Sequence, residues 1–116
     1  SMCFDVRFAT MFTYYAKKGA NVLVVPAAFV ATTGRAHWTT LLRARAIETL
    51  SYVLAPNQVG KNEHGVLCWG HSMVISPWGD VLAEASGSRE EIIYTCLEFK
   101  ELNKVRAMFP TIARLY

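Results

Sequence analysis

The sequence predicts a layered α/β fold with a mixed sheet and helices packed on it. Residues 21–26, NVLVVP, form a β-branched run without alternation, which is typical of a strand buried on both faces and paired in parallel. Residues 67–85 hold apolar runs on either side of a turn at Pro77–Gly79, which predicts an antiparallel hairpin. Apolar residues at helical spacing both precede and follow this first strand. The 116 residues suffice for one core.

The first helix is expected between Cys3 and the parallel strand. Apolar side chains recur there at the spacing of one helix stripe, at Phe8, Met11, Phe12 and Tyr15. Gly19 suits the position just after a helix end. Residues 27–36, AAFVATTGRA, are interpreted as a loop because Thr33 and Gly34 are typical of turns.

Residues 37–51 are expected to form the second helix. Its apolar face carries Trp38, Leu41, Leu42 and Ala46. Arg45 falls in the middle of this face, where an unpaired charge is costly, so we expect an ion pair with Glu48 one turn later. The alternative is an arginine at the rim that extends its charge into water.

The C-terminal half is expected to complete the sheet. A strand is predicted over 52–60, then a polar loop, the 67–85 hairpin and another strand over 90–99. A short helix begins at Lys100 and ends before Pro110, with Leu102, Val105 and Phe109 on its inner side.

The composition argues against several classes of partner. The net charge is +3 without any basic run, so no nucleic-acid partner is expected. No apolar stretch reaches the roughly 18 residues of a membrane span, and none resembles a signal peptide. The three cysteines are far apart and lack metal-ligand spacing, which predicts reduced thiols, a cytoplasmic location and no metal or cofactor.

Cys3 is the candidate nucleophile because it directly precedes the first predicted helix. A helix N-terminus stabilises a thiolate, and its free N–H groups can receive an oxyanion. Arg7 would meet Asp5 or bind an anionic substrate group. The alternative for Cys3 is a plain buried hydrophobic residue. A thiol also needs a base, and His71 is the best histidine candidate, so a Cys–His hydrolase stays open.

Several motifs together resemble the nitrilase (carbon–nitrogen hydrolase) superfamily. They are CFDVRF around Cys3, AFVATTGRAHW, LLRARAIE, WGHSMVISPWGDVLAEA and the closing LY, in order and over almost the whole chain. The resemblance implies an αββα sandwich and a Glu–Lys–Cys triad that hydrolyses an amide through a thioester. Cys3 is then the nucleophile, and the backbone N–H of Phe4 helps to form the oxyanion hole.

The triad glutamate and lysine lie upstream of the cysteine in this superfamily, and the motifs that match here begin at the cysteine. We therefore expect residues 1–116 to be the C-terminal portion of a single carbon–nitrogen hydrolase domain, half of the sandwich, with the N-terminal portion absent. By itself such a portion is expected to be inactive. Glu48 matches a structural helix glutamate of the superfamily and does not replace the catalytic one.

Within the superfamily the chain looks most like the Nit branch. Its ω-amidases hydrolyse 2-oxoglutaramate and 2-oxosuccinamate, and its sister enzymes hydrolyse deaminated glutathione. The resemblance places Arg7, Phe29 and Thr33 in the substrate site, where a guanidinium suits a carboxylate. Thr10 stands where the family usually has a glutamate, and Asp5 would take over part of its role.

Three functions therefore remain open from the sequence. The first is a thiol amidohydrolase of the ω-amidase or deaminated-glutathione type, acting on a small carboxylated amide. The second is a non-catalytic half-domain that oligomerises through an exposed core, and the third is the Cys–His hydrolase. Association into a homodimer and a cytoplasmic or mitochondrial location are the accompanying expectations.

Overall fold

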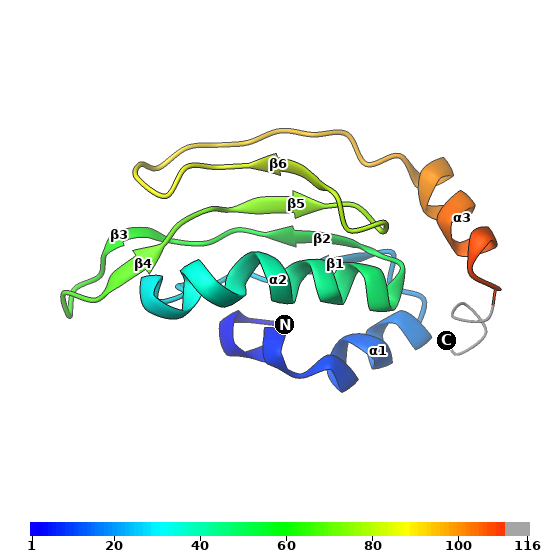
Figure 1. The fold of residues 1–116 in the computed structure, drawn as a ribbon, viewed down its shortest axis with the longest axis horizontal. Helices are drawn as coiled ribbons and strands as arrows, with labels where there is room; N and C mark the ends of the chain where they lie inside the picture. Colours follow the sequence, from blue (N-terminus) through cyan, green and yellow to red (C-terminus); the bar gives the residue numbers. More distant parts are fainter. Residues whose placement is uncertain (111–116) are drawn as a thin grey trace.

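The computed structural model describes residues 1–110, so the closing LY motif lies outside the described residues. Its elements follow one another as an α/β chain (Figure 1). In order they are η1, a 3-10 helix (Cys3–Arg7), α1 (Ala9–Lys17), β1 (Val22–Val24), α2 (Ala31–Thr49), β2 (Tyr52–Ala55), β3 (Val59–Lys61), β4 (Leu67–Trp69), β5 (Met73–Ile75), β6 (Val81–Glu84) and α3 (Phe99–Met108).

The main sheet is mixed, as predicted, with strand order β1-β2-β5-β6. β1 pairs in parallel with β2, whereas β2–β5 and β5–β6 are antiparallel. The β5–β6 hairpin closes at the predicted turn, where the Ser76 N–H donates to the Asp80 carbonyl at 2.8 Å. The expected strand over 52–60 is divided into β2 and β3, because Pro56 has no N–H for a sheet ladder. β3 pairs with β4 in a separate two-stranded sheet.

The core lies between the sheet and the helices α1 and α2 (Figure 1). Trp38 and Leu42 of α2 and Phe12 of α1 are fully buried there against Leu23 and Val53 of the sheet. The predicted apolar face of α2 is therefore confirmed. On α1, by contrast, Phe8, Met11 and Tyr15 remain partly or largely exposed.

The opposite face of the sheet is apolar and only partly covered. The register aligns Val24, Leu54, Val74 and Ala83 in one row across all four strands. Alternate residues of a strand point to opposite faces, so Leu23 is buried under the helices while Val24 is 49% exposed. The prediction that β1 is buried on both faces is therefore wrong for the structure described.

Residues 31–36 belong to α2 and not to the expected loop. Gly34 is buried in the first turns of α2, and a Cβ on it would lie 2.5 Å from the Cβ of Trp69. The glycine thus permits the close approach of α2 to β4, and the turn expected at this position is not formed. Thr33 consequently lies on a helix.

The strand expected over 90–99 is also absent from the described structure. The segment between β6 and α3 runs extended (Figure 1), and no strand of residues 1–110 pairs with it. Its side chains Ile92 and Tyr94 are 77% and 84% exposed. A β-type sequence pattern needs a neighbouring strand to form a ladder, and this segment has none. The final helix is confirmed as α3, which buries Leu102 and Val105.

Candidate active site

Cys3 occupies a constrained position at the start of η1. Its φ is +46°, in the left-handed region that residues with a Cβ seldom adopt. Its N–H donates to the Pro26 carbonyl at 2.8 Å, which fixes the residue against the segment that follows β1. Such backbone conformations cluster at functional sites, where the surrounding structure holds them in place.

The residues after Cys3 leave one backbone donor free beside the thiol. The Phe4 N–H has no acceptor within residues 1–110, while the Asp5 N–H bonds to the Met2 carbonyl. The Asp5 carboxylate accepts the Met2 N–H at 2.8 Å and so stabilises the turn. A free N–H directly after a nucleophile is suited to receive an oxyanion.

Cys3 opens into a cavity of about 540 Å³. The cavity is lined by Met2, Cys3, Pro26, Ala27, Ala28, Pro56, Asn57, Gln58 and Ser72. None of these lining side chains carries a charge. Within residues 1–110 the cavity therefore supplies a thiol, amide and hydroxyl groups, but no carboxylate base and no amine.

An ion pair on α2 anchors the helix that carries the thiol. Arg45 is only 5% exposed, and its guanidinium pairs with the Glu48 carboxylate, which is partly open to solvent. Its Nε donates to the Val6 carbonyl of η1 at 2.8 Å. The predicted partner of Arg45 is thus in place, and the sequence alone did not reveal the additional bond to η1.

Arg7 is held by aromatic rings and a histidine. Its guanidinium carbon lies 5.6 Å from the Phe4 ring centre and 5.5 Å from the Phe29 ring centre. Its Nη2 lies 3.3 Å from Nδ1 of His37. The expected contact of Arg7 with Asp5 is absent from the described structure, because the Asp5 carboxylate caps η1 instead.

Thr10, which stands where the family has a glutamate, is exposed at the start of α1.

Phe29 contacts Arg7, whereas Thr33 lies on α2 one turn before His37, the histidine that contacts Arg7. Phe29 is buried, with its ring 4.9 Å from that of Trp38 and beneath the Arg7 guanidinium. Thr33 is in the first turn of α2 and donates its hydroxyl to the Val30 carbonyl at 3.3 Å. Arg7, Phe29 and Thr33 do not line the cavity of Cys3, so thiol and guanidinium occupy adjoining regions.

The structure adds His37 and Asn57 to the surroundings of the predicted site residues. His37 follows Thr33 by one helical turn, so both lie on the same face of α2, a spacing that the sequence does contain. Asn57 lines the cavity of Cys3 and bonds to the Phe29 N–H at 2.9 Å. No sequence signal identifies that contact, because 28 residues separate the two.

His71 does not serve as the base of Cys3 in this structure. Its ring stacks on Trp69 at 4.3 Å, and its Nδ1 lies 2.8 Å from a carboxylate oxygen of Glu84. His71 is not among the residues that line the cavity of Cys3. The Cys–His hydrolase hypothesis therefore has no support from the geometry.

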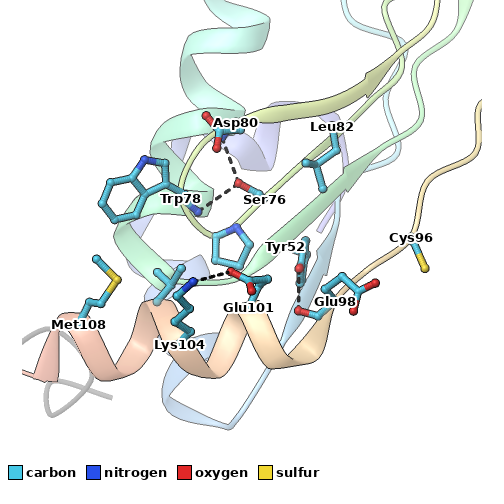
Figure 2. A pocket seen from close by; sticks show the side chains of 12 residues that line it. Tyr52, Ser76, Trp78, Asp80, Leu82, Cys96, Glu98, Glu101, Lys104 and Met108 are labelled. Atoms are coloured by element: carbon cyan, nitrogen blue, oxygen red, sulfur yellow. Dashed lines mark hydrogen bonds and ion pairs between the residues drawn. The ribbon is translucent and has the colours of Figure 1, made fainter.

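A second cavity of about 450 Å³ lies between α3 and the β5–β6 turn (Figure 2). Tyr52, Trp78, Leu82 and Met108 give it an apolar wall, and Glu98 and Glu101 lie at its edge. Burial raises the pKa of the Tyr52 phenol, whose hydroxyl donates to the Glu98 carbonyl at 2.9 Å. The thiol in this cavity is Cys96, whereas Cys3 lines the first cavity.

Residues 1–110 contain no group of three or more His, Cys, Asp or Glu side chains arranged to hold a metal ion. None of the helices in that range is long and apolar enough to cross a membrane.

Comparison with known families and structures identifies the chain. The family described as carbon–nitrogen hydrolase matches residues 1–107. The chain belongs to the carbon–nitrogen hydrolase family. In fold, this carbon–nitrogen hydrolase chain resembles crystalline Nit3 of Saccharomyces cerevisiae, a member of branch 10 of the nitrilase superfamily, with a TM-score of 0.88 and 35% identity. That match covers 95% of this chain and 40% of Nit3.

Two curated relatives carry enzyme names. Omega-amidase NIT2 of Bos taurus is 40% identical over 97% of the chain and 41% of its own length. The deaminated glutathione amidase of a Synechocystis strain is 44% identical over 97% of the chain and 41% of its own length. This carbon–nitrogen hydrolase chain thus spans about two fifths of the length of the curated relatives it matches.

Proposed function

We propose that this chain carries the nucleophile and part of the substrate site of a thiol amidohydrolase. Its substrate would be a small amide that also bears a carboxylate, of the 2-oxoglutaramate or 2-oxosuccinamate type. The observation that carries the proposal is the arrangement at η1. Cys3, in a left-handed backbone conformation, is followed by the free N–H of Phe4, and Arg7 lies four residues after Cys3.

The proposed reaction divides amide hydrolysis into two steps. The Cys3 thiolate attacks the amide carbon, and the Phe4 N–H donates to the oxyanion of the tetrahedral intermediate. The C–N bond then breaks and the nitrogen takes up a proton. Ammonia departs, and a thioester remains on Cys3. Water attacks the thioester carbon, which releases the carboxylic acid and restores the thiol.

The proposed reaction needs a base and a cation that the cavity of Cys3 lacks. A general base must take the thiol proton and later activate water, and a cation must stabilise the oxyanion. The lining residues of Cys3 include neither group. We propose that they are the glutamate and lysine of the family triad, supplied by a segment outside residues 1–116.

Arg7 is the proposed binding group for the substrate carboxylate. A guanidinium binds a carboxylate through two parallel hydrogen bonds, and here two aromatic rings limit its movement. The resemblance to the Nit branch supports two substrates, the amides of 2-oxo acids and deaminated glutathione, and the name of one curated relative contains the second. Both carry a carboxylate next to a ketone, so Arg7 suits either one, and deaminated glutathione amidase is the second candidate.

The apolar row Val24–Leu54–Val74–Ala83 supports a partner on the open face of the sheet. A sheet face of this kind is normally covered by another layer. We propose that the rest of a carbon–nitrogen hydrolase domain covers it and supplies the base and the cation. A non-catalytic half-domain that associates with its own copies through this face is the alternative, and it predicts an unreactive Cys3.

A chimeric enzyme tests the proposed activity. In it, residues 1–116 replace the matching segment of Bos taurus omega-amidase NIT2. We expect the chimera to release ammonia from 2-oxoglutaramate, and Cys3→Ala to lower the rate on the order of 10⁴-fold or more. The purified chain 1–116 is expected to release none.

Two outcomes would contradict this account. Ammonia release by chain 1–116 that disappears in Cys3→Ala would show that the base and the cation lie within this chain. Equal rates for the chimera with and without Cys3→Ala would exclude Cys3 as the nucleophile.

A further inference from the structure

Asn57 connects the region of the thiol with the region of the guanidinium. It lies between β2 and β3 and lines the cavity of Cys3. Its side-chain oxygen accepts the Phe29 N–H at 2.9 Å, and its side-chain nitrogen donates to the Gly70 carbonyl at 2.6 Å. The side chain therefore joins the segment after β1 to the corner between β4 and β5.

The backbone of Asn57 is bound as firmly as its side chain. Its N–H donates to the Ser72 hydroxyl oxygen at 2.8 Å, and that hydroxyl donates to the Asn57 carbonyl at 3.2 Å. The flanking residues pair with the same segment, because the Ala27 N–H bonds to the Pro56 carbonyl and the Gln58 N–H bonds to the Ala27 carbonyl. Asn57 is thus held from both sides and is a rigid link.

Both parts of the proposed site rest on the segment that Asn57 holds. The Cys3 N–H donates to the Pro26 carbonyl, at the beginning of this segment. The Phe29 ring, at its other end, lies beneath the Arg7 guanidinium. A shift of residues 26–29 would therefore change the position of the thiol relative to the cation.

We propose that Asn57 is a positioning residue that sets the placement of the Cys3 thiol relative to Arg7, and hence the preference for substrates that carry a carboxylate. This inference rests on the proposed function, because it takes Cys3 as the nucleophile and Arg7 as the carboxylate group. Asn57 itself takes part in no bond-making step.

The test compares two alkylating reagents of nearly equal size on chain 1–116. Iodoacetate carries a carboxylate and iodoacetamide is neutral, and the same thiolate attacks both and displaces iodide. Their rate ratio at Cys3, followed by peptide mass spectrometry, therefore reports the nearby positive charge and not the thiolate fraction. A cation about 6 Å away in water favours the anionic reagent by about threefold.

The matched control is Asn62, in the turn between β3 and β4. Its side-chain oxygen accepts the His64 and Val66 N–H groups at 3.0 and 2.9 Å, so it too makes two side-chain bonds to the backbone. Asn57→Ala is expected to lower the iodoacetate-to-iodoacetamide ratio about threefold, to that of Arg7→Met. Asn62→Ala is expected to keep the wild-type ratio.

The variants separate the role of Asn57 from the role of Arg7. An unchanged ratio in folded Asn57→Ala, with a lowered ratio in Arg7→Met, would overturn the role of Asn57 and leave the proposed function intact. An unchanged ratio in Arg7→Met would refute the carboxylate role of Arg7, and the inference with it. If Asn57→Ala fails to fold, Ser72→Ala removes the partner of the Asn57 N–H, and an unchanged ratio there would overturn the proposal.

Discussion

Replacing Trp38 by alanine is expected to lower the free energy of unfolding by about 4 kcal/mol. Trp38 is fully buried at the centre of the core, with its ring 4.9 Å from that of Phe29. Its indole N–H donates to the His71 carbonyl at 2.9 Å, so the substitution leaves a cavity and an acceptor without its donor. Urea unfolding followed by circular dichroism measures the change.

The exposed Trp78 provides the control for this substitution. Trp78 is 51% exposed and contacts Phe109 at the edge of the molecule, with ring centres 5.7 Å apart. Trp78→Ala is expected to change the free energy of unfolding by less than about 1 kcal/mol. Equal losses for the two tryptophans would contradict the placement of Trp38 in the core.

Glu48→Ala is expected to cost more stability than Arg45→Met, although Glu48 is the more exposed partner. Without Glu48, the buried Arg45 guanidinium keeps its charge but loses its anion, which costs about 3 kcal/mol. Without Arg45, Glu48 still reaches water, and only the Val6 carbonyl loses a donor, which costs about 1–2 kcal/mol.

The double variant Arg45→Met/Glu48→Ala separates this explanation from a simple loss of contacts. We expect its cost to lie close to that of Arg45→Met alone, because no buried charge remains. Urea unfolding of the wild type, both single variants and the double variant gives the coupling. If the loss of unfolding free energy in the double variant equals the sum of the two single losses, the two charges are not coupled and the explanation is contradicted.

The sequence predicted those elements whose structure depends on residues close together in the sequence. The apolar stripe of α2, the β5–β6 turn and the parallel β1 each depend on nearby residues or on one regular pattern. The start of α2 was missed because Gly34 is explained only by Trp69, a residue of another element. The strand expected over 90–99 failed for the same kind of reason, since a strand needs a partner that the pattern cannot supply.

The candidate site likewise combines residues that a short motif predicts with long-range contacts that it does not predict. By resemblance, the motif around Cys3 predicts both the nucleophile and the role of Arg7, because both residues lie in one short stretch. The contacts that hold them are long-range: Cys3 to Pro26, Arg7 to His37, Arg45 to Val6 and Asn57 to Phe29. Such contacts depend on how the elements pack, so a single sequence does not reveal them.

Competition among the three thiols for a limiting amount of iodoacetamide tests the central claim, that Cys3 is a prepared nucleophile. Cys96 is exposed, Cys3 is half-buried and Cys68 is buried. Exposure alone therefore favours Cys96, whereas a thiol prepared for attack favours Cys3. In urea, where the fold is lost, all three should react at similar rates.

We expect the first label on folded chain 1–116 at neutral pH to lie mostly on Cys3, as located by peptide mass spectrometry. A first label that lies mostly on Cys96, with Cys3 no faster in the folded chain than in urea, would contradict it.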